Sequence, residues 1–335
     1  MTETQKPRIG ISMGDPAGVG PELCAQLLNI EEILNICTPV VFGDHRVIAI
    51  AAEKCGYPFD AQKLDVGQLY PTDTPLEGPA VMHVPTLEDN WNRPGTVCEQ
   101  TGRASFDYVK TAIDGALCGE VKAVVTAPIN KEAWQAAGIK YPGHTELFAE
   151  RTECERFCMM MTSPLFSCSL VTTHVGYHEV PGLLSSNRIS EVIQLTHAAL
   201  QRIYDKPDPS LVALGLNPHA GEQGLFGNRE EEAIIVPAIE DARQAGIEVA
   251  GPLPPDTAFI PRLRESTDGY ICMYHDQGLI PFKALSFDTG VNVTLGLPMV
   301  RTSVDHGTAL DIAWQGRADV SSLVSAIRLA VKLAD

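Results

Sequence analysis

The sequence predicts an α/β protein built on a mainly parallel sheet with helices on both faces. Short runs rich in β-branched residues alternate with amphipathic stretches of helical period along the whole chain. Strands separated by helices are typical of βαβ units, which place neighbouring strands parallel. The length of 335 residues exceeds what a single hydrophobic core usually reaches, so we expect one large domain or two linked domains.

The individual elements follow from these patterns in chain order. We expect strands at residues 7–13, 39–42, 123–127, 169–173, 211–216 and 270–274. Amphipathic periodicity predicts helices at residues 21–34, 101–117, 190–204, 230–245 and 319–333. Residues 66–94 contain several prolines and few periodic apolar residues, which indicates an irregular connection or a short antiparallel excursion. No stretch has the composition of a flexible linker, so two domains would share the sheet or exchange strands.

Charge and composition exclude several classes of partner. The chain carries 25 basic and 42 acidic residues, and this net charge of -17 disfavours nucleic acid as a partner. No run approaches the roughly 18 apolar residues of a membrane helix, and the N-terminus lacks the apolar core of a signal peptide. The nine cysteines are scattered, which favours reduced core residues in a cytoplasmic protein. We therefore expect no nucleic-acid and no membrane partner.

A glycine-rich segment at residues 14–22 reads GDPAGVGPE and lies between a predicted strand and a predicted helix. Three glycines permit a tight turn and close backbone approach. The segment is not a P-loop, because no Gly-Lys-Ser/Thr follows, and its spacing differs from the G-x-G-x-x-G of dinucleotide sites. A glycine-rich turn is the plainer interpretation.

Three histidines follow predicted strands, at His174, His219 and His275. The carboxyl ends of parallel strands meet at one edge of a sheet, and three imidazoles with an open position suit a catalytic divalent metal. The plainer alternative is that each histidine makes a single hydrogen bond in a turn or core. Asp256 and Asp276 could accept a proton from a substrate hydroxyl, or could only orient the histidines.

Basic and polar residues in two further regions suit an anionic substrate. Lys283, Asn292 and Arg301 can together bind a carboxylate or a phosphate, although Lys283 suits a solvated surface equally well. His144 and Thr145 open a predicted helix whose free N–H groups suit a phosphate, although Thr145 could be only a cap.

The segment 305–313, DHGTALDIA, is a glycine turn before a helix and could hold a nucleotide or only connect two elements.

Taken together, these segments resemble the 4-hydroxythreonine-4-phosphate dehydrogenase family over essentially the whole chain. The matching blocks are residues 14–22, 126–133, 141–146, 172–174, 215–222, 251–257, 273–278, 290–298 and 301–313. The resemblance implies an isocitrate- and isopropylmalate-dehydrogenase-like fold with two α/β domains and an interdomain cleft. Residues 1–128 plus 290–335 would form the cofactor side, and residues 129–289 the metal, substrate and dimerisation side. It also implies a homodimer whose active sites use both subunits.

The resemblance also assigns residues to roles. It makes His174, His219 and His275 ligands of one divalent metal (Zn, Mg or Co). Asp256 and Asp276 remain the candidate catalytic carboxylates from their place in the sequence. The substrate positions it implies are His144, Thr145, Lys283, Asn292 and Arg301. The segment 305–313 is similar to the nucleotide loop of that superfamily, except that Trp314 replaces the usual glycine. The expected NAD(P) contacts are therefore Asp305, His306, Gly307 and Asp311.

The implied reaction is NAD(P)-dependent oxidation of 4-phosphohydroxy-L-threonine to 2-amino-3-oxo-4-phosphooxybutanoate. This product decarboxylates to 3-amino-2-oxopropyl phosphate, in pyridoxal phosphate biosynthesis. Residues 175–180, VGYHEV, depart from the apolar-proline-leucine run that is usual in the family. This departure leaves open a paralogue that oxidises erythronate or threonate 4-phosphate or a cyclic cis-dihydrodiol. Alternatives from other classes are a zinc phosphoesterase and a non-catalytic phosphometabolite-binding protein.

Overall fold

The computed structural model describes residues 6–68, 76–88 and 91–334. The chain forms two compact units, which are described separately. Unit 1 comprises Met1–Cys154 and Leu297–Asp335, and unit 2 comprises Glu155–Gly296. Unit 1 is therefore discontinuous in sequence. Its first boundary falls after Cys154, whereas we expected it after residue 128, because the helices of residues 131–151 pack on the long helix of unit 1.

Unit 1 contains an all-parallel sheet whose strands are buried on both faces. Its strands are β1 (Arg8–Ser12), β2 (Thr38–Gly43), β3 (Gln62–Asp65), β4 (Ala80–His83), β5 (Ala123–Thr126) and β12 (Val300–Ser303). They lie in the order β3-β4-β2-β1-β5-β12, and every neighbouring pair is parallel. Such burial explains why β1 and β2 read as nearly continuous apolar runs rather than as alternating patterns.

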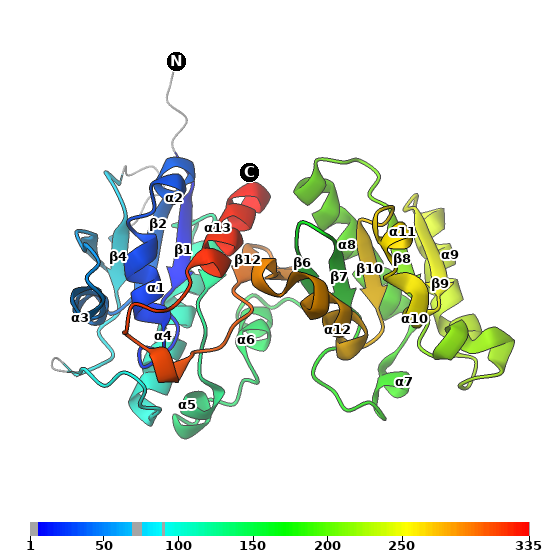
Figure 1. Cartoon of the computed structure of the whole chain (residues 1–335), viewed down its shortest axis with the longest axis horizontal. Helices are drawn as coiled ribbons and strands as arrows, with labels where there is room; N and C mark the ends of the chain where they lie inside the picture. The colour runs from blue at the N-terminus through cyan, green and yellow to red at the C-terminus, as the bar shows by residue number, and fades with distance from the viewer. Residues whose placement is uncertain (1–5, 69–75, 89–90, 335) are drawn as a thin grey trace, which may run out of the picture. The chain divides into compact units, whose positions relative to one another are not determined.

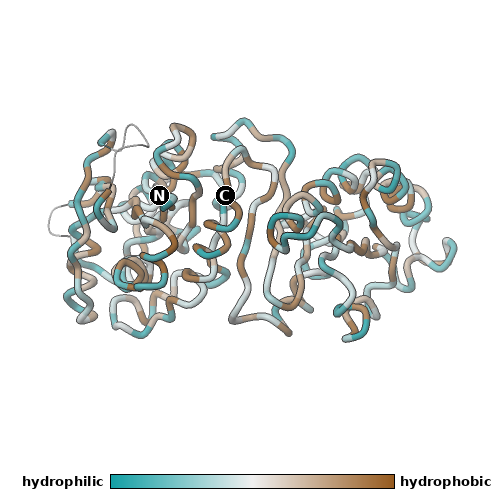
Figure 2. Tube along the Cα trace, turned by 90° about the horizontal axis from the view of Figure 1, so that it is seen from above, coloured by the Kyte–Doolittle hydropathy of each residue, from teal (hydrophilic) through white to brown (hydrophobic). Residues whose placement is uncertain are grey.

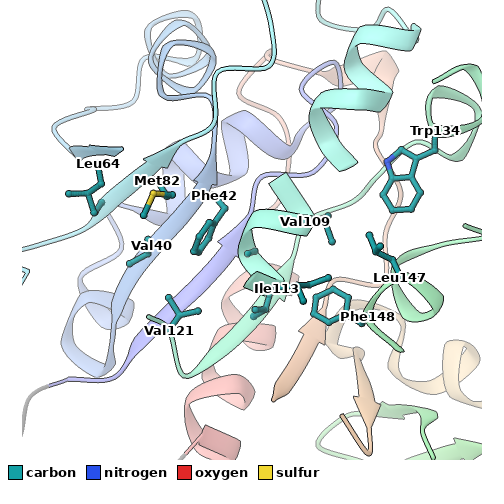
Figure 3. Close-up of a cluster of buried hydrophobic side chains, with 13 residues drawn as sticks. Val40, Phe42, Leu64, Met82, Val109, Ile113, Val121, Trp134, Leu147 and Phe148 are labelled. Atoms are coloured by element: carbon teal, nitrogen blue, oxygen red, sulfur yellow. The ribbon is translucent and has the colours of Figure 1, made fainter. Parts of the chain in front are cut away.

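Helices cover both faces of this sheet (Figure 1). The helices of unit 1 are α1 (Gly20–Leu27), α2 (Glu31–Ile36), α3 (His45–Cys55), α4 (Glu99–Leu117), α5 (Lys131–Ala136), α6 (His144–Arg151) and α13 (Ser321–Ala334), of which α5 and α6 pack on α4. On the α4 face, Val109 and Ile113 pack against Val40 and Phe42 of β2, and Trp134 and Phe148 extend this core (Figure 3). The C-terminal helix α13, red in Figure 1, packs on β12 and β5.

Unit 2 contains a mixed sheet. Its strands are β6 (Cys158–Thr162), β7 (Ser167–Leu170), β8 (Leu211–Leu214), β9 (Val249–Leu253), β10 (Gly269–Cys272) and β11 (Val291–Leu295). They lie in the order β11-β6-β7-β10-β8-β9, with β6 antiparallel to both neighbours and β7, β10, β8 and β9 parallel. In both units, hydrophobic residues recur in short stretches separated by hydrophilic ones (Figure 2).

The helices of unit 2 are α7 (Val180–Leu183), α8 (Ser186–Tyr204), α9 (Val236–Gln244), α10 (Pro255–Ala258), α11 (Pro261–Arg264) and α12 (His275–Ser286). One core lies between α12 and the sheet, where Phe282 and Leu279 contact Phe166, Tyr270 and Leu170. Helix α8 packs on β6, β7 and β10, and α9 packs on α8. Ser185 caps α8 by accepting a hydrogen bond from the amide of Arg188, as an N-terminal serine commonly does.

The predicted α/β class is confirmed, and all six predicted strands are present within a few residues of their expected bounds. Two local predictions are wrong. The helix expected at 21–34 is two helices, because Ile30 adopts an extended conformation as the N-cap of α2. The excursion expected within 66–94 contains β4, which pairs parallel and not antiparallel with β2 and β3. Residues 69–75 and 89–90 of that region lie outside the described residues. No described helix is long and apolar enough to cross a membrane.

Candidate functional site

Two of the three predicted metal ligands lie together at one edge of the unit 2 sheet. His174 follows β7 and His275 begins α12 directly after β10, and these two strands are parallel neighbours. The imidazole centroids are 5.8 Å apart. The adjacency follows from the register, since Leu170 lies opposite Cys272 at the carboxyl ends of the two strands.

A carboxylate orients His275. Asp276 Oδ1 lies 2.7 Å from His275 Nδ1, and the hydroxyl of Tyr177 donates a hydrogen bond to Asp276 Oδ2. The bonds from Tyr177 and from His275 lower the pKa of Asp276, so this carboxyl is ionised at neutral pH. The same carboxylate raises the pKa of Tyr177, whose hydroxyl therefore remains a donor. Both oxygens of Asp276 are thus engaged.

The third predicted ligand, His219, lies in a separate loop of unit 2. Residues 219–223 adopt positive φ, from 43° at Glu222 to 78° at Gly221. Glu231, which is 2% exposed, supports this loop by accepting hydrogen bonds from the backbone N–H (2.8 Å) and the side-chain amide (3.0 Å) of Asn217. The ring of His219 packs at 6.0 Å from the ring of Phe226.

A metal-bound histidine commonly donates its other N–H to a carboxylate, and Asp276 is placed to accept from His275 in this way. The pair His174 and His275 therefore fits as part of a nitrogen-ligand site. Among residues 6–68, 76–88 and 91–334, however, no three metal-ligating side chains of one chain form a group. One copy of the chain brings together two of the three expected imidazoles.

The other predicted residues of unit 2 are dispersed. Asp256 lies exposed in the first turn of α10, and α10 packs against the loop that carries His219. Lys283 is exposed on α12, with its ammonium 5.9 Å from the ring of Phe287. Asn292 lies on β11, and its buried Oδ1 has no hydrogen-bond partner among the described residues.

Unit 1 gathers basic residues around a buried arginine. Arg301 on β12 is 3% exposed, and its Nη2 donates to Thr126 Oγ1 of the neighbouring strand β5 at 2.7 Å. Burial lowers the pKa of Arg301 to about 10, so the guanidinium is charged at neutral pH. Its carbon Cζ lies 5.7 Å from the ring of Phe148, which holds the guanidinium plane against α6.

His144 lies close to this guanidinium at the start of α6. Burial, reinforced by the charges of Arg301 and Lys131, lowers the pKa of His144 well below its usual value, so its ring is neutral at pH 7. Its Nε2 is buried without a hydrogen-bond partner in the described structure. Thr145, the second residue of α6, forms no cap bond, so the plain N-cap interpretation of Thr145 is wrong.

Sequence reasoning missed Lys131 as a site residue. It is the first residue of α5, after the Asn130 cap, and its charge acts on His144. The signal was present, because Lys131 belongs to the matching block at residues 126–133 that follows β5. It was also missed that Tyr177 engages Asp276, and no sequence pattern links positions so far apart.

The segment expected to hold the nucleotide follows β12 and contacts the glycine-rich loop after β1. Thr308 O accepts a hydrogen bond from the amide of Val19 (3.0 Å). A side chain at Gly18 would place its Cβ 2.7 Å from the same carbonyl oxygen, so only glycine fits there. His306 bonds the Gly307 carbonyl through Nδ1 (2.9 Å), while its Nε2 is buried without a partner in the described structure.

The remaining residues of this segment form its outer part. Asp305 is partly buried, and Asp311 lies exposed in a short 3-10 turn, Leu310–Ile312. Trp314 is 4% exposed and adopts φ +59, a conformation that glycine takes more easily. Its ring packs edge-on against Trp91 at 5.9 Å and lies under the ammonium of Lys54 at 5.1 Å. Trp314 therefore anchors the segment by packing.

The comparison with protein families decides the relationship. The model of the pyridoxal phosphate biosynthetic protein PdxA matches residues 35–330. The chain belongs to the PdxA family. It is 44% identical over 331 residues to a 4-hydroxythreonine-4-phosphate dehydrogenase of Desulforapulum autotrophicum, covering 97% of this chain and 95% of that protein. It is also 44% identical over 333 residues to a putative D-threonate 4-phosphate dehydrogenase of Oceanobacillus iheyensis, covering 99% of each.

Solved structures agree with this membership of the PdxA family. A crystal structure of 4-hydroxythreonine-4-phosphate dehydrogenase from Klebsiella pneumoniae superposes with a TM-score of 0.84 at 38% identity, covering 98% of this chain and 100% of that chain. A beta-decarboxylating dehydrogenase from Thermococcus kodakarensis shares the fold alone, with a TM-score of 0.51 at 11% identity, covering 98% and 83%. The expected isocitrate- and isopropylmalate-dehydrogenase-like class is therefore confirmed.

Proposed function

We propose that this chain is an NAD(P)-dependent dehydrogenase that oxidises the secondary alcohol of 4-phosphohydroxy-L-threonine in pyridoxal phosphate biosynthesis. The observation that carries the proposal is the buried guanidinium of Arg301, with His144 and Lys131 near it, in a chain whose net charge is -17. A buried guanidinium that stays charged suits an anionic ligand, and a phosphorylated hydroxy acid supplies two anionic groups. The relatives named 4-hydroxythreonine-4-phosphate dehydrogenase support this substrate.

The side chains of unit 1 would bind and orient the substrate. Arg301 would pair with a phosphate or carboxylate, its plane held by Thr126 and Phe148. Neutral His144 would donate from its buried Nε2 in one tautomer, and Thr145 would add a hydroxyl and the free amides of α6. In unit 2, Lys283 and Asn292 are the other proposed substrate-binding residues, and the buried Oδ1 of Asn292 has no hydrogen-bond partner among the described residues.

His174, His219 and His275 would hold one divalent cation (Zn, Mg or Co), and the segment with Asp305, His306, Gly307 and Asp311 would hold NAD(P). When bound, the cation would supply Lewis acidity and the nicotinamide the oxidant, which side chains lack. Asp276 is held on both oxygens and would orient His275. We therefore assign the substrate proton to Asp256, which is exposed beside the loop of His219.

We further propose a homodimer that completes the metal site. One copy groups only two of the expected imidazoles, so a second copy would supply the rest. Helix α12 and the turn after it expose Ile280 (66%), Leu285 (43%) and Phe287 (66%), and exposed large apolar residues gathered on one element favour an interface. Light scattering at micromolar concentration tests this state, and a monomer that binds one metal with full affinity would refute it.

A second candidate substrate is D-threonate 4-phosphate. The relative that carries this name is as similar to the chain as the first relative is. Residues 175–180, which depart from the family pattern, place Tyr177 on the carboxylate beside His275. Oxidation of a cis-dihydrodiol is less well supported, because the basic residues around Arg301 suit an anion. Hydrolysis of a phosphoester is less well supported, because the relatives named are dehydrogenases.

The deciding experiment is a substrate panel. Purified protein with a divalent metal and NAD or NADP is supplied with 4-phosphohydroxy-L-threonine, D-threonate 4-phosphate or erythronate 4-phosphate, and reduced nicotinamide is followed by absorbance. We expect the highest kcat/KM with 4-phosphohydroxy-L-threonine. Turnover of a sugar acid alone would assign the paralogous function, and reduction with none of the three would refute the proposal.

A further inference from the structure

Tyr177 ends a three-member chain of hydrogen bonds that reaches a proposed metal ligand. Its hydroxyl donates to Asp276 Oδ2, and Asp276 Oδ1 lies 2.7 Å from His275 Nδ1. All three residues belong to unit 2. The ring of Tyr177 packs edge-on against Tyr274 at 5.7 Å, so the residue before His275 also contacts it.

The local backbone presents Tyr177 in this position. The amide of Gly176 donates to Glu179 Oε2 at 2.8 Å, and the amide of Glu179 donates to the carbonyl of Gly176 at 2.9 Å. These two bonds close a short turn around Tyr177.

The consequence concerns the imidazole of His275. An ionised carboxylate that faces Nδ1 selects the tautomer with hydrogen on Nδ1, which leaves Nε2 as the nitrogen with a lone pair. A carboxylate bound through one oxygen can still rotate about its last torsion. A donor on the second oxygen removes that freedom, so the acceptor geometry at Oδ1 is fixed.

We propose that Tyr177 is a positioning residue, which acts through Asp276 to fix the tautomer and orientation of His275 at the metal site. This inference rests on the metal role of His275 in the proposed function. On this proposal, residues 175–180 influence the affinity of the protein for its metal and do not contact the substrate directly.

The test measures metal affinity in the full-length protein. Chelator competition gives the Co²⁺ dissociation constant of the unsubstituted protein and of Tyr177→Phe, Asp276→Asn, the double variant and Tyr274→Phe. Tyr274→Phe is the matched control, because it removes a hydroxyl from the other ring of the same pair. We expect a loss of about 10- to 100-fold for Asp276→Asn and about 3- to 10-fold for Tyr177→Phe. The control should change little.

Two further readouts separate positioning from a structural role. The melting temperature of the metal-free Tyr177→Phe protein should equal that of the unsubstituted protein. In the Asp276→Asn background the Tyr177→Phe substitution should have no additional effect, because its action passes through Asp276. The visible spectrum of bound Co²⁺ in Tyr177→Phe should shift toward that of Asp276→Asn.

The outcomes are distinct. Full Co²⁺ affinity in Tyr177→Phe, an additive loss in the double variant, or a lower metal-free melting temperature would each overturn the positioning role. The proposed metal site would survive in all three cases. If the unsubstituted protein binds no Co²⁺, the metal site itself is wrong, and both proposals fail.

Discussion

Replacing Asp15 by asparagine should remove a defined part of the pH dependence of stability. Asp15 follows β1 and is 0% exposed. Its Oδ1 accepts a hydrogen bond from the amide of Ala17 at 2.8 Å, and its Oδ2 is buried without a partner within hydrogen-bond distance in the described structure. Burial therefore raises the pKa of Asp15 from 3.8 to about 6.

The sign and size of the effect follow from linkage. The folded state holds the proton up to about pH 6, while the unfolded chain releases it near 3.8, so the stabilisation is present at low pH and is lost as pH rises through about 6. The difference between the two pKa values corresponds to about 3 kcal/mol of folding stability in full. About 2 kcal/mol of this stabilisation is lost as the pH rises from about 4.5 to about 7.5. Asparagine keeps the Oδ1 acceptor and does not titrate.

The assay uses the tryptophan fluorescence of urea unfolding. All three tryptophans, Trp91, Trp134 and Trp314, lie in unit 1 with Asp15, so this signal reports the unit in question. We expect the free energy of unfolding of the unsubstituted protein, relative to Asp15→Asn, to rise by about 2 kcal/mol when the pH is lowered from 7.5 to 4.5. Asp60→Asn, at an exposed position of unit 1, is the control. Equal pH dependence in the unsubstituted protein and in Asp15→Asn would refute the reasoning.

Two further predictions concern the basic set and the segment after β12. Arg301→Lys keeps the positive charge but loses the planar guanidinium that donates to Thr126 at 2.7 Å. The kcat/KM for the phosphorylated substrate should therefore fall about 10- to 100-fold, while the melting temperature changes little. Unchanged KM and kcat would contradict the role of Arg301 in binding the substrate anion. Trp314→Gly removes a ring that is 4% exposed, which should destabilise unit 1 by about 3–5 kcal/mol. It also relieves the positive φ of Trp314, which should stabilise unit 1 by about 1–2 kcal/mol. The loss is the larger of the two effects. Urea unfolding of unit 1 should therefore show a net destabilisation, and a more stable variant would show that the packing of Trp314 is weak.

The elements that the sequence predicts well are those whose pattern is local. Strands β1, β5, β8 and β10 are short, largely apolar runs buried between parallel neighbours, and such runs are visible without knowledge of those neighbours. Strand β3, of sequence QKLD, buries one residue in four, so its pattern predicts nothing. It forms because β4 offers a parallel partner, which is a tertiary cause.

The same distinction applies to the candidate site. Strand-end position alone predicts that His174 and His275 meet, because β7 and β10 are parallel neighbours. It does not predict the loop of His219, in which non-glycine residues adopt positive φ under the constraint of Asn217 and the buried carboxylate of Glu231. Left-handed conformation at alanine, glutamate and glutamine is imposed by such contacts and carries no signal in residue type.

The glycine-rich loop after β1 shows why glycine spacing alone does not identify a ligand. A Cβ at any of its three glycines would lie too close to a backbone carbonyl oxygen. It would be 2.3 Å from that of Pro128 at Gly14, 2.7 Å from that of Thr308 at Gly18 and 2.0 Å from that of Met13 at Gly20. The glycines are therefore explained by the approach of the chain to itself, with no phosphate required. Because Val19 also donates to Thr308 O, the loop shapes the segment that we propose for NAD(P). The two segments lie at opposite ends of the sequence, but any substitution at Gly18 would act on the cofactor segment through that single carbonyl.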